Sequence, residues 1–346
     1  MTWKQRIPGY LATLLAIALS AMWTWWGVAE LYYEGWWGSW YNRLPYLVPG
    51  AVCLSMSLLA LTWPRAGAIL LLAVGAAFSV WWWVEDLLDG HGIQLWRLPV
   101  YLMLGGAVLL IGVLFWLEAR RRQRIPPRDP PRPWWQRHSG VLITLAVCAL
   151  ITGGVSTYYL PIVLTREDDG ERGIRYIETP QGALWWAPQG PGWNWKQSWG
   201  GYPSWHRLAL YGVEPVGLSL KDHPATESAM QTTGLCAYLD ESGTMLLDQP
   251  AYIWRMPTAG EIAAALARHG ENAGCEWDGE PGFMDCRTMP DKETPLWAPD
   301  QAPIYYWAAD AYNDAQAYYV SYNGAVQATR KTGGNPRHGY RCVREP

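Results

Sequence analysis

The second half of the sequence, residues 165–346, has no apolar run long enough to cross a bilayer and no basic face with interleaved aromatic residues. The first absence excludes a membrane span there, because a spanning helix needs about 20 apolar residues. The second argues against nucleic acid as a partner. The histidines His206, His223 and His269 lack metal-ligand spacing, and no serine lies in a nucleophile elbow. Neither a metal site nor a hydrolase is therefore predicted.

The first half instead contains apolar stretches of spanning length, none of which has a charge in its middle. They are Gly9–Trp26, Leu44–Trp63, Ala66–Val84, Leu98–Leu117 and Val141–Leu164. A buried soluble helix rarely sustains such runs, so we expect five transmembrane helices. Transport and proton relay usually place ionisable groups at mid-membrane. The absence of such groups, and of an obvious inverted repeat, favours a block that anchors the chain or interacts with the bilayer and other membrane subunits.

Basic residues lie in alternate loops of the predicted spans, which predicts the orientation. They are Lys4 and Arg6 before the first span, Arg65 between the second and third, and Arg120, Arg121, Arg122, Arg124, Arg128, Arg132 and Arg137 after the fourth. The other loops are acidic, with Glu30, Glu34, Glu85, Asp86 and Asp89. Because basic loops stay cytoplasmic, we expect the N-terminus inside and the part after the fifth span outside.

The same N-terminal charges, with the apolar core Leu11–Leu19, also resemble a signal peptide. The tryptophans that follow, Trp23, Trp25 and Trp26, fit an interfacial aromatic belt better than a cleavage site. Cleavage would leave the rest of the topology unchanged.

Four segments follow from these patterns. Residues 1–119 form a four-span transmembrane block, 120–139 a basic Pro-rich cytoplasmic linker, 140–164 the fifth transmembrane helix, and 165–346 an extracytoplasmic domain. The linker cannot be a continuous helix because it contains five prolines between residues 124 and 133.

The four cysteines of the predicted outer domain are Cys236, Cys275, Cys286 and Cys342. In an oxidising compartment they suggest two disulfides, for which three pairings exist. Cys275 and Cys286 bracket a short loop and pair most simply, which leaves Cys236 with Cys342. Reduced thiols or a metal site are the alternatives, although neither the spacing nor a nearby histidine pair supports zinc. The other two cysteines lie within predicted spans.

The outer domain is predicted to mix helices and short strands. Helices are expected over Pro224–Leu239 and over Ala259–His269, the second capped by Thr258 and Glu261 and stopped by Gly270. Strands are expected over Ile174–Glu178, Ala183–Ala187, Ile304–Ala308, Ala317–Tyr322, Ala325–Thr329 and Tyr340–Arg344, with a strand-like run Tyr252–Met256 before the capped helix. Asn323-Gly324 predicts a hairpin, and residues 271–303 an irregular insert.

Several motifs of this domain resemble a known family. They are Cys236-Ala-Tyr-Leu239, Trp254-Arg-Met-Pro-Thr258 with Glu261, Tyr306-Trp307-Ala308, Asn323-Gly324 and Tyr340-Arg-Cys-Val343. Residues 174–346 are similar to the C-type-lectin-like fold, in the formylglycine-generating-enzyme-like superfamily. The closest resemblance is to its non-catalytic bacterial Lcl C-terminal type domains. Met256 and Ala308-Ala309 depart from the family's leucine and serines. The membrane block resembles no family.

The resemblance implies an α+β lectin-like domain on a bacterial inner membrane, facing the periplasm or the cell surface. Catalytic relatives bind copper through two closely spaced cysteines near the C-terminus. Here Cys275 and Cys286 are too far apart and precede the final strands, and Cys342 is alone. No copper site, and no enzyme, is therefore expected. The few oxygen ligands in the insert, Glu271-Asn272, Asp278 and Asp285, are expected to be solvated rather than to bind calcium.

Tryptophans are the candidate ligand-binding residues of this domain. They are Trp193, Trp195, Trp199, Trp205, Trp277 and Trp297. Exposed rings would stack on an envelope glycan or dock a protein; alternatively, the rings fill a domain that has little regular structure. We therefore expect a membrane-anchored recognition or adhesion protein without cofactor. The alternatives are a formylglycine-generating-type oxidoreductase with a displaced site and a subunit of a larger membrane complex.

Overall fold

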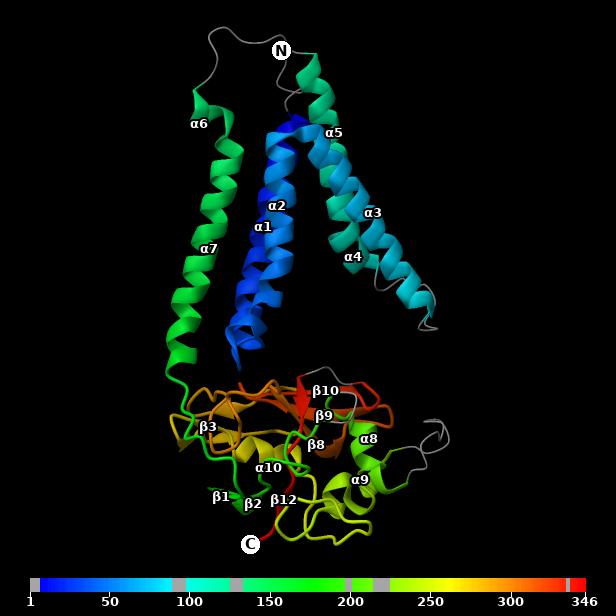
Figure 1. Ribbon diagram of the computed structural model, residues 1–346, viewed down its shortest axis with the longest axis vertical. Coiled ribbons are helices and arrows are strands. Elements are labelled where there is room, and N and C mark those ends of the chain that lie inside the picture. Colours follow the sequence, from blue (N-terminus) through cyan, green and yellow to red (C-terminus); the bar gives the residue numbers. More distant parts are fainter. Residues whose placement is uncertain (1–6, 89–97, 125–132, 197–200, 214–224, 334–336) are drawn as a thin grey trace. The chain divides into compact units, whose positions relative to one another are not determined.

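The computed structural model of the chain describes residues 7–88, 98–124, 133–196, 201–213, 225–333 and 337–346. The chain forms two compact units (Figure 1). The helical unit comprises Met1–Trp36 and Trp40–Pro161, and the sheet-containing unit comprises Trp37–Ser39 and Ile162–Pro346. The division therefore falls inside the last long helix, close to the predicted boundary at residue 164.

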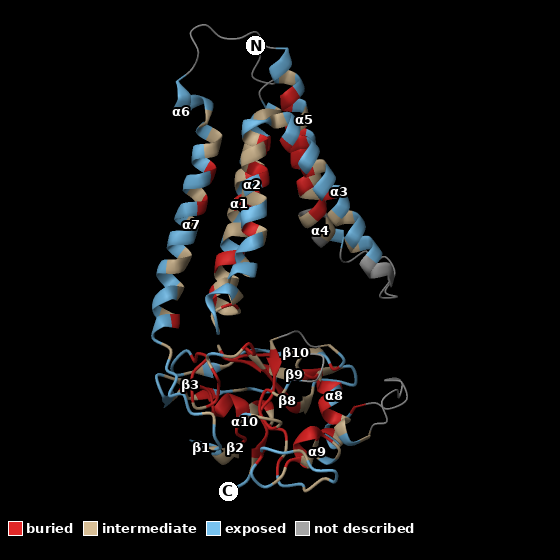
Figure 2. Cartoon of the chain, in the orientation of Figure 1, coloured by how far each residue is buried: buried red, intermediate tan, exposed pale blue. Residues whose placement is uncertain are grey.

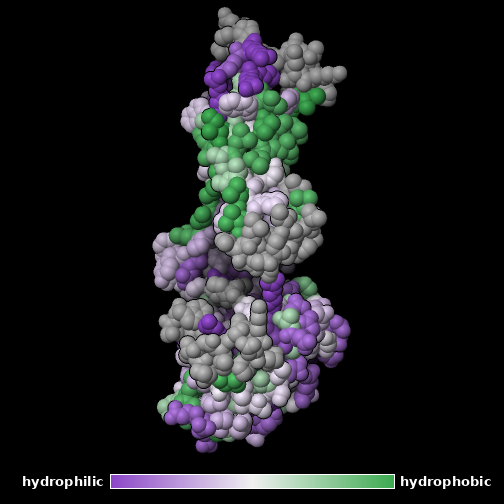
Figure 3. Space-filling model, turned by 90° about the vertical axis from the view of Figure 1, so that its right-hand side faces the viewer, coloured by the Kyte–Doolittle hydropathy of each residue, from purple (hydrophilic) through white to green (hydrophobic). Residues whose placement is uncertain are grey.

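In the described part of the helical unit, four helices are long and apolar enough to cross a membrane. Their spanning segments lie in α1 (Ile7–Tyr33), α2 (Leu44–Thr62), α3 (Pro64–Leu88) and α7 (Ser139–Leu164). The short helices η2 (Trp40–Asn42) and α6 (Trp134–Arg137) complete the turns before α2 and α7. On the face seen in Figure 3, hydrophobic residues form a band across this unit and hydrophilic residues gather at one end. Arg120, Arg121 and Arg122 form a basic last turn of α5.

The fourth predicted span is helical but interrupted. It consists of α4 (Leu98–Tyr101), the π-helix η4 (Leu102–Gly106) and α5 (Ala107–Gln123). No single piece reaches the length of the other four helices. Glycines bring α5 against α3: a Cβ on Gly112 would lie 2.9 Å from Cγ of Leu72, so a larger residue would push the helices apart.

The sheet-containing unit is built from two main sheets and two short hairpins. The three-stranded sheet has the order β1 (Arg175–Thr179), β2 (Gly182–Trp186), β12 (Val343–Arg344). The five-stranded sheet has the order β11 (His338–Gly339), β8 (Tyr305–Ala311), β9 (Gln316–Ser321), β10 (Ala325–Arg330), β6 (Gly282–Phe283). The hairpins pair β3 (Ala267–Arg268) with β4 (Glu271–Asn272) and β5 (Cys275–Glu276) with β7 (Asp285–Cys286). The predicted strands, apart from 252–256, are all present, although residues 340–342 of the last one lie outside it.

The helices of this unit are short. They are α8 (Trp205–Ala209), η5 (Tyr211–Val213), α9 (Glu227–Thr232), η6 (Leu235–Tyr238) and α10 (Ala259–Ala264). The single helix predicted over 224–239 is therefore wrong: α9 stops before Gly234, where a Cβ would collide with the carbonyl oxygen of Met230. Pro224 lies outside the described residues.

The capped helix α10 begins as predicted and ends early. Thr258 accepts a hydrogen bond from the Glu261 amide while the Glu261 carboxylate accepts one from the Thr258 amide, which confirms the capping box. The chain leaves the helix after Ala264 and turns at His269 and Gly270, both with positive φ. The run 252–256 forms no strand and contributes one bridge, Arg255 to Val343.

Arg255 is a partly buried residue that forms two ion pairs. It pairs with Glu261 at 2.6 Å and with Glu345 at 2.7 Å. The start of α10 is thereby joined to the C-terminal end of the chain.

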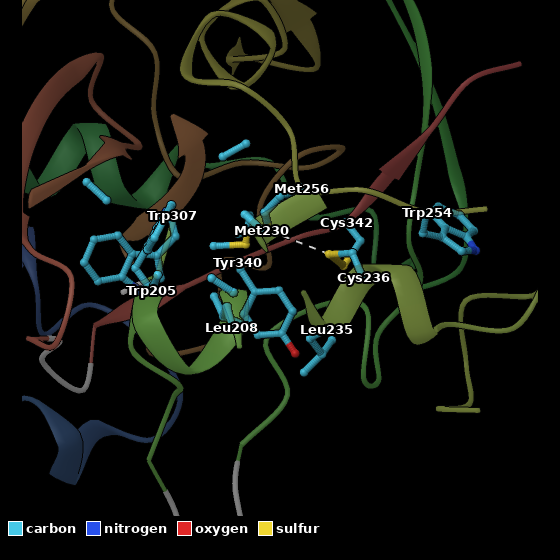
Figure 4. Close-up of a cluster of buried hydrophobic side chains, with 14 of the residues drawn as sticks. Trp205, Leu208, Met230, Leu235, Cys236, Trp254, Met256, Trp307, Tyr340 and Cys342 are labelled. Carbon is cyan, nitrogen blue, oxygen red and sulfur yellow. Dashed lines mark hydrogen bonds between the residues drawn. A yellow bond between two sulfur atoms is a disulfide. The ribbon is translucent and has the colours of Figure 1, made fainter. Parts of the chain in front are cut away.

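Both disulfides of the predicted pairing are present, Cys236–Cys342 and Cys275–Cys286. The first lies in the main core of the unit (Figure 4). Around it pack large side chains from distant segments: Trp205, Leu208, Met230, Leu235, Trp254, Met256, Trp307 and Tyr340. Strand β8 contributes Trp307 and Ala309 to this core, and α10 is also largely buried in the unit (Figure 2). The closing motif Tyr340–Val343 is thus part of the core.

The segment that follows α7 is fixed to the sheet-containing unit by buried charges. Arg166 pairs with Asp291 at 2.8 Å, and Arg268 bridges Asp291 and Glu293 at 2.6 and 3.1 Å. Asp291 and Glu293 are both buried. A buried pair is costly to break because the remaining charge loses its compensation. The chain after Leu164 therefore belongs structurally to this unit.

His338 lies among three aromatic rings. Its ring centroid is 4.9 Å from that of Tyr305, 4.6 Å from Trp307 and 4.8 Å from Tyr319. Burial disfavours the imidazolium and lowers the pKa of His338 to about 4. The imidazole is therefore neutral in the folded protein at neutral pH.

This buried imidazole predicts a loss of stability in mild acid. The unfolded histidine takes up a proton below pH ~6.5 while the folded one does not, so stability falls between pH ~6.5 and ~4, by about 3 kcal/mol in total. His338→Phe keeps an aromatic ring and should remove this component. Urea midpoints of wild type and variant, measured from pH 7 to 4.5, test it. The raised pKa values of Glu293 and Asp310 act in the opposite direction but equally in both proteins. Parallel curves would contradict the prediction.

Candidate ligand-binding surface

Three of the six candidate tryptophans fill the core. Trp193, Trp205 and Trp297 are exposed by 1, 0 and 0 %. The Trp193 indole donates to the Tyr306 hydroxyl at 2.7 Å, and Trp297 stacks on the Tyr306 ring with centroids 3.8 Å apart. The Trp205 indole donates to the Ala308 carbonyl at 2.7 Å. Ligand stacking needs accessible ring faces. These three tryptophans therefore pack the core and do not bind a ligand.

The other three candidates differ among themselves. Trp195 is partly buried against the main core. Trp199 lies outside the described residues. Trp277 is partly exposed on a loop closed by a disulfide. Of the five candidate tryptophans that the structure describes, Trp277 is the one that lies on an accessible loop held by a disulfide.

That loop, residues 275–286, is here called the stapled loop. The disulfide Cys275–Cys286 and the pairing of β5 with β7 close its base. Strand β6, within the loop, pairs with β10 at the edge of the five-stranded sheet. The Trp277 indole donates to the Glu280 carbonyl at 2.8 Å, and the Asp278 carboxylate accepts from the Glu280 amide at 3.0 Å. These bonds fix the loop although it contains little regular structure.

A row of aromatic rings connects the stapled loop to the β8–β9 hairpin. Ring centroids are 5.1 Å apart for Trp277 and Tyr318 and 5.4 Å for Tyr318 and Tyr312. The Tyr318 hydroxyl donates to the Gly279 carbonyl at 3.1 Å, which ties the sheet to the loop. Tyr312 is 46 % exposed, and Phe283 is 74 % exposed. We call the stapled loop with Tyr312 and Tyr318 the stapled-loop surface.

The stapled-loop surface is strongly acidic. The loop carries four exposed carboxylates and no basic residue: Glu276, Asp278, Glu280 and Asp285. Within the described part of the chain, none of the four forms an ion pair. Burial raises the pKa of Tyr318, and the neighbouring carboxylates of Glu280 and Asp310 add to the rise. Tyr318 itself is buried, with 8 % of its surface exposed. The surface therefore combines the accessible rings of Trp277, Phe283 and Tyr312 with negative charge that no ion pair among the described residues compensates.

A cavity of about 500 Å³ lies elsewhere in the unit, beside the segment that follows α7. Its lining is Glu167, Asp168, Asp169, Arg175, Gly270, Thr294 and Pro295. Arg172 pairs with Asp168 at 2.8 Å, and Arg175 pairs with Asp169 at 2.5 Å. Because two of its three carboxylates are already paired and no aromatic ring lines it, this cavity offers a ligand less than the stapled-loop surface does.

Several residues of the stapled-loop surface were not identified from the sequence. The sequence does not single out Phe283, Tyr312 or Tyr318 for ligand binding, and it predicts solvated side chains for Asp278 and Asp285. The available signal was an apolar residue, Phe283, inside an acidic loop bracketed by two cysteines. Among the described residues, no three side chains of His, Cys, Asp or Glu are grouped to hold a metal ion.

No family model, curated protein or solved structure matches this chain. The resemblance to the formylglycine-generating-enzyme-like superfamily therefore stays a prediction from the motifs.

Proposed function

We propose that the chain is a membrane-anchored binding protein whose sheet-containing unit recognises an envelope ligand through the stapled-loop surface. The observation that carries the proposal is the exposure of Phe283 on a loop closed by a disulfide. Contiguous exposed apolar patches often mark contact sites, and the same loop also carries the partly exposed Trp277. Most of the described tryptophans of this unit are buried. The exposed aromatic rings of the loop are therefore not explained simply by the unit's high tryptophan content.

The proposed topology has five spans, with α4, η4 and α5 together forming the fourth. A π-helical segment is compatible with a membrane span because its backbone groups remain hydrogen-bonded within the helix. The basic end of α5 supports a cytoplasmic N-terminus, and the two disulfides support an oxidising compartment for the sheet-containing unit. The membrane would be a bacterial inner membrane. Protease added outside spheroplasts should digest the sheet-containing unit; complete protection would reject this orientation.

The fold proposed for the outer unit is C-type-lectin-like. The capping box at Thr258, the hairpin at Asn323-Gly324 and the disulfide Cys236–Cys342 support it, as does the pairing of β12 with β2, which joins the two ends of the unit. The oxidoreductase alternative is less favoured because all four cysteines of this unit are in disulfides. The two free thiols, Cys53 and Cys148, lie in α2 and α7.

A specific observation favours the alternative of a membrane-complex subunit. Among the described residues, no atom lies within 4 Å of the positions where Cβ atoms on Gly153 and Gly154 of α7 would be. Small residues on transmembrane helices commonly allow close helix packing. If α7 binds another subunit, Gly153→Leu should abolish co-purification of stoichiometric membrane partners; unchanged co-purification would reject it.

The binding proposal is tested with the full-length chain in detergent micelles, retained on immobilised envelope fragments. Phe283→Ser should weaken retention about tenfold or more, because a hot-spot anchor contributes about 2 kcal/mol or more and about 1.4 kcal/mol corresponds to tenfold. Tyr252→Ser is the matched control, since Tyr252 is similarly exposed at 63 % but lies outside the stapled-loop surface. Equal retention of both variants and wild type would reject the proposal.

A further inference from the structure

The charge of the stapled loop restricts the chemistry of its ligand. Its four carboxylates lie within ten consecutive residues, and the nearest basic residue in sequence is Arg287, just after the loop. Such a concentration of like charge is unfavourable in the free protein, since each carboxylate raises the energy of the others. A cationic ligand would relieve this repulsion, whereas an anionic bilayer surface would increase it.

Apolar exposure restricts the ligand further. Phe283 lies among the four carboxylates, and Met289, just beyond the loop, is 63 % exposed. A small cation would leave these side chains in water. A polypeptide segment with both basic and large apolar residues would satisfy both parts of the surface. A neutral glycan would use the rings but gain nothing from four uncompensated charges.

The loop is also held in place before any ligand binds. Its base is closed by the disulfide, its edge strand pairs with β10, and Tyr318 is bonded to Gly279. Binding to a pre-organised surface loses little conformational entropy, so modest contacts give measurable affinity.

We propose that the stapled-loop surface binds a cationic polypeptide segment that carries at least one large apolar side chain. This inference rests on the proposed binding function and specifies its partner class. The carboxylates attract and orient the basic residues, which speeds association. Phe283, Trp277 and Tyr312 receive the apolar side chain and supply the contact that persists at high salt, while the buried Tyr318 packs between Trp277 and Tyr312 and supports them.

The test uses the full-length chain in non-ionic detergent and three labelled probes. These are a 16-residue peptide of Lys, Leu and Phe, the same peptide with Glu in place of Lys, and a neutral chitin hexasaccharide. Binding is measured by fluorescence anisotropy at 50 and 300 mM NaCl. We expect the cationic peptide alone to bind, with affinity falling severalfold at the higher salt because exposed charges are screened.

Two variants with the same change in net charge separate a local from a general charge effect. The loop variant is Glu276→Gln, Asp278→Asn, Glu280→Gln and Asp285→Asn; the amide that replaces the Asp278 carboxylate keeps an oxygen to accept from the Glu280 amide. The control variant is Glu178→Gln, Glu241→Gln, Asp248→Asn and Glu271→Gln, all exposed positions outside the loop. We expect the loop variant to bind the cationic peptide at least tenfold more weakly than wild type, and the control variant to change binding less than threefold.

Equal losses in the two variants would overturn the inference, because binding would then depend only on net charge. Binding of the hexasaccharide alone, unchanged in the loop variant, would also overturn it. The proposed function would survive that second result if Phe283→Ser still weakened retention on envelope fragments. The proposed function would fail in a different way: Phe283→Ser and wild type would then be retained equally on envelope fragments.

Discussion

Replacing Arg341 with Met is expected to destabilise the sheet-containing unit by about 3–5 kcal/mol, because it leaves three carbonyl acceptors without their buried, charged donor. The Arg341 side chain is 0 % exposed. Its guanidinium donates to the carbonyls of Ala187 at 2.9 Å, Pro295 at 2.7 Å and Leu296 at 2.9 Å. It also lies 3.6 Å from the centre of the Trp193 ring. One side chain thus joins β2, the insert and the Trp193 segment.

The physical cost arises from the acceptors left behind. Met fills much of the same volume but donates no hydrogen bond, so three carbonyls would lose their guanidinium donor, each at about 1–3 kcal/mol if no water replaces it. Burial lowers the pKa of Arg341 to about 9, which still leaves the guanidinium charged at neutral pH. Arg341→Lys should retain part of the stability, because an ammonium keeps the charge but cannot match the planar geometry of the three bonds.

Arg344→Met is the matched control for Arg341→Met. Arg344 is near the same end of the chain, contacts the Trp254 ring at 4.9 Å and donates one 3.2 Å bond to the Glu241 carbonyl, but it is only partly buried. Pulse proteolysis of the full-length chain in urea measures both variants. Loss of less than 1 kcal/mol in Arg341→Met, or equal losses in the two variants, would show that the buried guanidinium does not hold this unit together.

Local signals allowed several elements of the unit to be predicted from the sequence. The capping box depends on Thr258 and Glu261, three residues apart, and the hairpin on Asn323-Gly324, where Gly324 adopts φ +84°. The pairing of Cys275 with Cys286 likewise follows from a short separation. In each case the residues that decide the structure lie within one turn or one short loop, so the pattern is visible in the sequence.

Long-range packing could not be predicted in this way. The burial of Trp193 depends on Tyr306, which lies 113 residues away, and that of Trp205 on Ala308, 103 residues away. Gly and Pro interleaving is compatible with both an exposed and a packed loop, so the sequence left these rings undecided. The stapled-loop surface was missed for the same reason: Tyr318 meets Trp277 only after β9 joins the sheet.

The interruption of the fourth span was also not visible in hydropathy. Leu98–Leu117 is apolar throughout, and apolar composition does not distinguish an α-helix from a π-helical segment. The close approach of α5 to α3 at Gly112 depends on which residues face each other across two helices. Hydropathy indicates which environment a segment prefers. The backbone geometry of the segment also depends on the helices that pack against it.

Removal of the disulfide Cys236–Cys342 by double substitution with Ala should cost about 4–5 kcal/mol, the second large effect expected in this unit. The bond joins residues 106 apart, and closing a loop of about 100 residues restricts the unfolded chain by about 4.7 kcal/mol in the chain-entropy model. Removal of Cys275–Cys286, with a separation of 11, should cost about 3 kcal/mol by the same relation. Urea midpoints of the two double variants give the comparison.

The two disulfides should also differ in their response to reductant, because their accessibility differs. Cys236 and Cys342 are both in the core, whereas Cys286 is partly exposed on the stapled loop. Thiol–disulfide exchange needs access to a sulfur atom. Mild dithiothreitol should therefore open Cys275–Cys286 first, as detected by thiol labelling and mass spectrometry, and weaken retention on envelope fragments while the unit stays folded. Simultaneous reduction of both bonds under native conditions would contradict the burial of Cys236–Cys342. Selective reduction without any loss of retention would mean that ligand binding does not depend on the stapled loop being closed.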